Sequence, residues 1–129
     1  MTSAHHLLGL ACVAGSLVVM VAAGWSAVAG WRSGGRSDHR LLVDRAVLAM
    51  LAILVAAGLF GVGLLLTGSR PVDLLHVIYG PASLISLPVA IWAGARTSSA
   101  DGSRIRRDIW TAGGGVVLLG IVLRLFATG

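Results

Sequence analysis

The sequence predicts an all-α integral membrane protein, a four-helix up-down bundle, and three observations support this fold class. First, 57% of the 129 residues are hydrophobic and 12% are charged. The mean hydropathy of +0.91 exceeds what a soluble domain of this size reaches. Second, uncharged runs cover residues 7–31, 46–67, 74–95 and 109–123. Third, the arginines gather between these runs in an alternating pattern.

The first element, residues 6–31, is expected to be a retained transmembrane helix. Its amino end, MTSAHH, lacks Lys and Arg, and its apolar run is longer than the core of a signal peptide, although SAVAG resembles a cleavage site. The single cysteine, Cys12, lies inside this run. The sequence therefore offers no disulfide framework, and no CxxCH motif for covalent haem attachment is present.

The next two elements, residues 42–67 and 72–95, contain uncharged runs that meet the length of about 20 residues that a membrane-spanning helix needs. Pro81 and Pro88 each remove a backbone hydrogen bond from the third helix, so we expect a kink there. The fourth element, residues 106–127, has a shorter uncharged run. It reaches spanning length when Arg124 lies at the far interface with its charged end in water.

Small residues are frequent in the second and fourth helices, in the segments AAGLFGVG and AGGGVVLLG. Such surfaces allow helix backbones to approach closely in a membrane. The loops are short, so residues 1–129 form a single predicted transmembrane domain.

All ten basic residues are arginine, and eight of them lie in or beside the first and third loops: Arg32, Arg36, Arg40, Arg45, Arg96, Arg104, Arg106 and Arg107. By the positive-inside rule these loops face the cytoplasm, which places both termini outside the cell inner (plasma) membrane. The net charge of +5 is therefore a topology signal, and contact with anionic lipid is the simplest further role of these arginines. No basic segment with interleaved aromatic residues is present, so we expect no nucleic-acid partner.

The first and third helices begin with a similar pattern, H-x-x-x-G-x-A. It comprises His5, Gly9 and Ala11 in the first helix, and His76, Gly80 and Ala82 in the third. The second and fourth helices also end alike, in LLLTG and RLFATG. A duplicated helical hairpin would produce this arrangement, and chance matches among Gly, Ala and Leu would also produce it.

The two similar helix starts suggest a site for haem b. In an up-down bundle the first and third helices are diagonal, so His5 and His76 would lie at the same depth, across a gap of roughly 11–14 Å that two imidazoles can bridge through one iron. Gly9 and Gly80, each four residues after its histidine, would leave room for a flat macrocycle. The remaining candidates are His6 as an alternative to His5, Arg124 as a partner for propionates, and Tyr79 beside Gly80.

This pattern resembles small four-helix haem membrane proteins, namely the cytochrome b561 type and one half of haem A synthase. The resemblance implies that His76, together with His5 or His6, supplies the axial ligands of a haem that serves electron transfer or haem handling. The chain has no second pair of histidines and no glutamate, whereas a haem A synthase half would offer an acidic residue near its haem. Oxidative chemistry on haem is therefore not expected.

Each candidate residue also has a simpler interpretation. His76 lies near an interface, where Tyr79, Asp73, lipid or water can satisfy it, while His5 and His6 can be solvated terminal residues. For Arg124 the simpler interpretation is an interfacial anchor with no role toward a cofactor. Asp44 with Arg45, and Asp108 with Arg104, fit the role of helix-end charges.

Three other functional classes can be compared with haem binding. A proton-coupled exporter would need an acidic residue in a helix interior, and we predict none there. A copper site could use His5, His6, His76 and Met1, but no set of ligands rich in Met or Cys supports it. The serious alternative is a non-catalytic subunit or assembly factor without a cofactor, which would bind other membrane subunits, or a second copy of itself, through the glycine-rich faces of the second and fourth helices.

Overall fold

The computed structural model describes residues 2–34, 39–68, 74–97 and 103–128 of the chain. The described residues form four helices: α1 (Thr2–Arg32), α2 (Arg40–Leu66), α3 (Leu74–Arg96) and α4 (Ser103–Thr128). All four are long and apolar enough to cross a membrane. The predicted all-α, four-helix class is confirmed, and the observed bounds differ from the predicted ones by a few residues. Residues 72 and 73, assigned to the third helix from the sequence, lie outside the described part.

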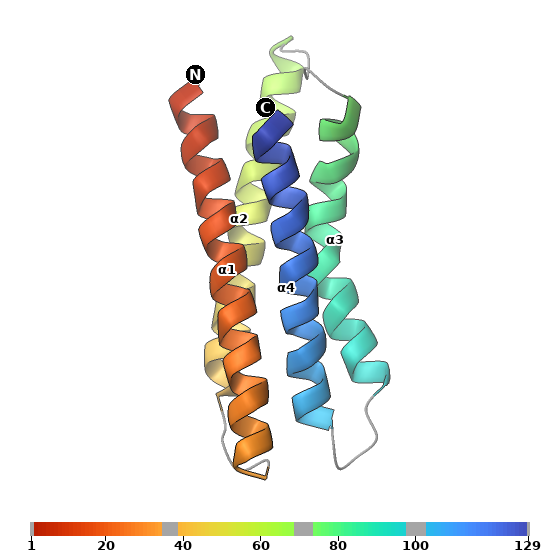
Figure 1. The fold of residues 1–129 in the computed structure, drawn as a ribbon. Coiled ribbons are helices and arrows are strands. Elements are labelled where there is room, and N and C mark those ends of the chain that lie inside the picture. Colours follow the sequence, from red (N-terminus) through yellow and green to blue (C-terminus); the bar gives the residue numbers. More distant parts are fainter. Residues whose placement is uncertain (1, 35–38, 69–73, 98–102, 129) are drawn as a thin grey trace.

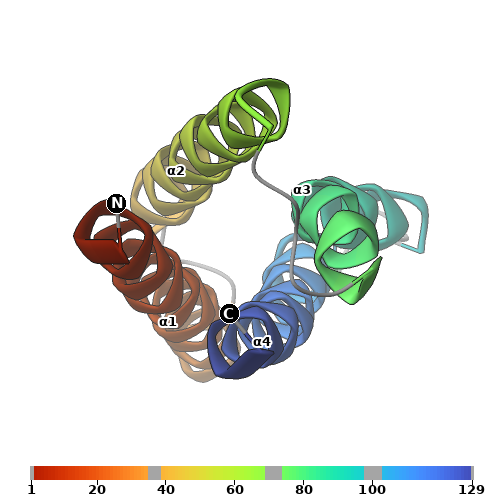
Figure 2. The same ribbon diagram turned by 90° about the horizontal axis from the view of Figure 1, so that it is seen from above.

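The helices run alternately up and down, as Figure 1 shows. Both chain termini lie at one end of the bundle, together with the end of α2 and the start of α3; we call this the terminal end. The opposite end, where α1 meets α2 and α3 meets α4, is called the arginine end. Viewed along the bundle, α1 packs beside α2 and α4, and α3 packs beside α4 (Figure 2). Helices α1 and α3 are therefore diagonal, and so are α2 and α4.

Each helix contributes a fully buried side chain to the core. These four residues are almost or completely inaccessible: Val19, Met50, Leu87 and Leu118. Buried hydroxyl groups donate to the backbone of their own helix, as when Ser16 bonds the carbonyl of Cys12 at 2.6 Å and Thr111 that of Arg107 at 2.9 Å. No buried side-chain polar atom of the described residues is left without a hydrogen bond. The apolar interior therefore accommodates these hydroxyls at little cost.

Glycines of α4 permit close contacts with two neighbouring helices. A Cβ atom at Gly114 would collide with the Cβ atom of Ala90 on α3, and one at Gly115 would lie 3.2 Å from the backbone of Met20 on α1. The preceding Gly113 is exposed and has nothing within 4 Å of such an atom. Close packing through the small residues of α4 is thus observed on two sides, toward α1 and toward α3.

Helix α3 remains continuous through Pro81 and Pro88. The hydroxyl of Ser83 bonds the carbonyl of Gly80 at 2.6 Å, and that of Ser86 bonds the carbonyl of Ser83 at 2.9 Å. Both serine hydroxyls therefore find their partners within α3, close to the two prolines.

Candidate functional site

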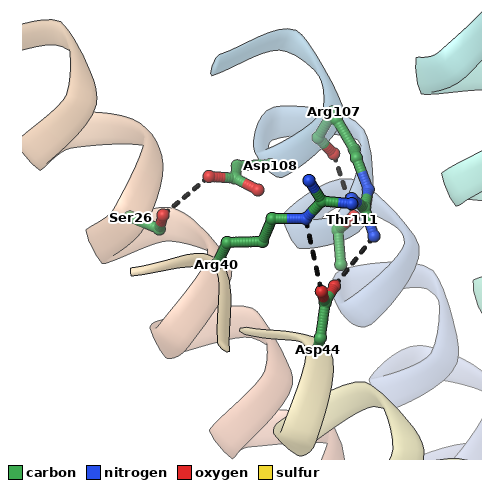
Figure 3. A network of polar contacts seen from close by, with 6 residues as sticks. All are labelled: Ser26, Arg40, Asp44, Arg107, Asp108 and Thr111. Atoms are coloured by element: carbon green, nitrogen blue, oxygen red, sulfur yellow. Dashed lines mark hydrogen bonds and ion pairs between the residues drawn. The ribbon is translucent and has the colours of Figure 1, made fainter. Parts of the chain in front are cut away.

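Polar side chains connect three helices at the arginine end (Figure 3). Arg107 of α4 donates from Nη2 to Oδ1 of Asp44 on α2 at 2.8 Å. Nε of Arg40 lies 3.5 Å from the other oxygen of the same carboxylate. The side chains of Arg107 and Asp44 are only 30% and 35% exposed, so this pair is partly shielded from solvent. A partly buried ion pair of this kind fixes the positions of the two helices that carry it.

A second polar contact joins α1 to α4 at the same end. The buried hydroxyl of Ser26 donates to Oδ2 of Asp108 at 2.6 Å. A short hydrogen bond to a carboxylate is stronger than one between neutral groups. Because Asp44 and Asp108 each have partners on another helix, both carboxylates help to assemble the bundle.

Sequence reasoning missed these contacts between helices. It assigned Asp44 and Asp108 to helix ends beside Arg45 and Arg104, yet the structure pairs Asp44 with Arg107 and Arg40, and Asp108 with Ser26. Both aspartates lie in the second turn of their helices, near the arginine end. One signal was present. Asp44 and Arg107 each lie four residues after the start of helices that begin at the same end, so opposite charges occupy the same depth.

The two predicted haem ligands occupy helix positions at the terminal end. His5 is the fourth residue of α1 and His76 is the third residue of α3, and these helices are diagonal and begin at the same end. His5 precedes the buried Cys12 by seven residues, and His76 precedes the buried Ser83 by seven. Residues seven apart share a helix face. Each histidine position therefore lies on the same side of its helix as a residue that is buried two turns further along, whereas the side chain of His6 is exposed.

Helix α2 loses its packing partners toward this end of the bundle. Its buried residues are Val43, Val47, Met50 and Leu54, and none of its residues beyond Leu54 is buried. Gly61 follows Leu54 by seven residues and so continues the buried face, yet it is exposed, and a Cβ atom added there would meet nothing within 4 Å. A Cβ atom at Gly80 on α3 would also meet nothing within this distance. Inward-directed positions of α2 and α3 therefore border open space at the terminal end.

The other predicted site residues are less closely grouped. Gly9 and Tyr79 are half-buried in the first part of α1 and of α3. Arg124 lies near the end of α4, and its side chain is exposed. Its position lies two residues after the buried Val122 and six after the buried Leu118, which places it on a different face of α4. The predicted site residues thus lie at similar depth near the terminal end, and Arg124 is exposed on the surface.

Among the described residues, no group of three or more His, Cys, Asp or Glu side chains lies close enough to hold a metal ion. A haem requires only two axial ligands from the protein, and the donor chemistry of two imidazoles fits that requirement.

Comparison with known proteins gives no assignment. No family model matches the chain, and neither the curated proteins nor the solved structures yield a significant match.

Proposed function

We propose that the chain is a small b-type haem membrane protein that serves electron transfer or haem handling, with His5 and His76 as the axial ligands. The observation that carries this proposal is the common placement of the two histidines. Each lies on the same side of its helix as a residue that is buried two turns further along, and the two helices are diagonal and begin at the same end. The exposure of His6 favours His5 as the ligand from α1.

Space for a flat group supports the same proposal. The inward face of α2 has no close neighbour at Gly61, and α3 has none at Gly80. Cofactor sites in helix bundles form between facing helices, from side chains that project inward. Glycine at these positions removes side chains that would otherwise fill the interior. Half-buried Gly9 and Tyr79 would lie beside such a group, and Arg124 would reach propionates only from the surface of α4.

Two imidazole ligands determine what such a site can do. A bound haem b supplies a one-electron iron couple, and ligation on both faces leaves no open position for substrate. The residues of this chain would hold the group, fix its orientation and set its potential through the apolar surroundings. The positive-inside rule places the arginine end in the cytoplasm, so we also propose that the site faces the outer side of the plasma membrane.

Absorption spectroscopy tests this proposal. The protein is purified in mild detergent from haem-replete cells, and reduced-minus-oxidised spectra are recorded for the wild type and for His76→Ala. We expect a Soret band and an α-band in the wild type that disappear in the variant, while far-UV circular dichroism stays unchanged. A folded wild type without haem, judged by the pyridine haemochrome assay, would overturn the proposal.

A non-catalytic membrane subunit is the second candidate, and the exposure of α2 favours it. The glycines Gly114 and Gly115 of α4 already pack against α3 and α1, so they are not available to a partner. Gly63 of α2 is exposed and open, together with the neighbouring Val62 and Leu65. Docking would therefore use open positions such as Gly63, and not Gly114 or Gly115. A colourless protein that copurifies in a defined complex, and loses that complex in Gly63→Leu, would support this candidate.

A further inference from the structure

A groove between α1 and α2 opens on the lipid-facing surface near the arginine end. It is shallow and largely open, with a volume of about 420 Å³, and is lined by Leu17, Val18, Val21, Ala22 and Trp25 of α1 and by Leu42 of α2. Trp25 is 64% exposed and Leu42 is 56% exposed, so their side chains form the open wall of the groove. A groove with only these apolar residues suits a hydrocarbon chain.

Two arginines flank this groove. Arg32 follows Trp25 by seven residues and therefore extends the same face of α1, about 10 Å closer to the arginine end. Arg45 follows Leu42 by three residues and adjoins it on the surface of α2. Both are exposed, and neither makes an ion pair or a hydrogen bond with another described residue.

Arginines on the opposite side of the bundle have partners within the chain. The guanidinium of Arg96 lies 4.0 Å from the centroid of the Trp92 ring. Arg106 donates to the carbonyl of Thr97 at 2.9 Å, and Arg107 pairs with Asp44. In the described part of the chain, the unpaired positive charge at this end therefore collects beside the α1–α2 groove.

We propose that the α1–α2 groove is a binding site for an anionic phospholipid of the leaflet that contacts the arginine end. One acyl chain lies along Val18, Val21 and Trp25. The headgroup phosphate lies at the end of the groove nearest Arg32 and is also bound by Arg45, whose long side chain extends toward the interface. Arginine suits this role because its planar guanidinium binds phosphate through paired hydrogen bonds. Basic positions between transmembrane helices bind anionic headgroups by the same chemistry.

Trp25 provides a built-in reporter for this site. The full-length protein is reconstituted in phosphatidylcholine vesicles that contain a small mole fraction of brominated phosphatidylglycerol or of brominated phosphatidylcholine. Bromine quenches tryptophan fluorescence on contact, and the part due to Trp25 is the difference between the wild type and Trp25→Phe. We expect the brominated anionic lipid to associate at least about fivefold more strongly, because each arginine near the surface contributes about that factor.

Substitutions of arginine distinguish a specific lipid site in the groove from a general attraction of anionic lipid to the basic surface. Arg45→Gln and Arg32→Gln should each reduce the preference for phosphatidylglycerol about fivefold. Arg45→Lys should keep most of it, because the charge remains. The matched control is Arg96→Gln, which removes an arginine of the same end on the other side of the bundle and should leave the Trp25 quenching unchanged. Far-UV circular dichroism and gel filtration verify that every variant is folded.

Two results would overturn the proposal. Equal quenching of Trp25 by the two brominated lipids would mean that the groove takes any lipid, without recognition of the headgroup. Quenching by neither lipid would mean that protein, such as a second copy of the chain, covers the groove. The site lies at the end opposite to His5 and His76, so its outcome is independent of haem binding.

Discussion

Asp44 on α2 and Arg107 on α4 form an ion pair, with 2.8 Å between Oδ1 and Nη2, although the two helices are diagonal in the bundle. The long guanidinium side chain spans the distance between helices that otherwise have little mutual packing. Four residues separate each partner from the start of its helix. The pair therefore fixes both the relative depth and the spacing of α2 and α4.

Removal of either partner of this pair should destabilise the bundle, and the effects of the two removals should not be additive. We expect Asp44→Ala and Arg107→Ala to show a coupling energy of about 1–2 kcal/mol in a double-mutant cycle, between the values for exposed and buried pairs, because both groups are about one-third exposed. Unfolding in mixed detergent micelles, followed by circular dichroism, measures it. Arg45→Ala, beside Asp44 but without an ion pair to any described residue, is the control and should change stability little. Additive effects of the two alanine variants would contradict this role for the pair.

Neighbouring glycines of α4 should respond oppositely to the same substitution. Gly114→Ala places a methyl group against Ala90, and the overpacking should cost about 1–3 kcal/mol of unfolding free energy. Gly113→Ala meets nothing within 4 Å, and the higher helix propensity of alanine should leave stability equal or slightly raised. Unfolding curves measured under identical micelle conditions compare them. Equal effects at the two positions would show that α3 and α4 are not in such close contact.

Adjacent histidines of α1 should differ in their effect on haem. If His5 is an axial ligand, His5→Ala should abolish the bis-imidazole α-band, because neither a five-coordinate haem nor a protein without haem has that spectrum. The exposed His6 provides the control, and His6→Ala should retain haem at the wild-type ratio. Haem content per protein and the reduced spectrum are the measurements. Loss of haem in His6→Ala with retention in His5→Ala would show that the ligand from α1 is His6 and would contradict the choice of His5.

Cysteine labelling tests the orientation in the membrane. In a Cys12→Ala background, Thr67→Cys lies at the terminal end, whereas Thr97→Cys lies at the arginine end. A membrane-impermeant thiol reagent added to intact cells should label Thr67→Cys and should reach Thr97→Cys only after the membrane is permeabilised. The opposite pattern would place the arginine end outside and would contradict the positive-inside assignment.

The helix number, and with it the shared end of the two termini, was predictable, because the length of an uncharged run is a strong local signal. The side-chain contacts between helices could not be predicted from the sequence. The contact between Asp44 and Arg107 depends on which helices are diagonal, and a single sequence does not state this. Similarly, the preference for His5 over His6 in the proposed haem site rests on the buried Cys12 two turns along α1. An apolar run does not reveal which of its faces is buried, because lipid and protein interiors favour the same side chains.

The use of glycine was only partly predictable for the same reason. AGGGVVLLG in α4 and AAGLFGVG in α2 have similar compositions, yet Gly114 and Gly115 are packed between helices while Gly61 and Gly63 have open surroundings. Composition identifies where backbones can approach. Only the arrangement of neighbouring helices determines where they do.

The most extensive contact in the bundle joins α1 to α4, the first and last helices of this sequence. During synthesis α1 enters the membrane well before α4 leaves the ribosome, so its buried face, including Val19 and Ala23, has to wait for its main partner. In that interval lipid or a membrane chaperone covers the face. Insertion of each span can therefore proceed helix by helix, while closure of the bundle becomes a late, single event that depends on the last part of this chain.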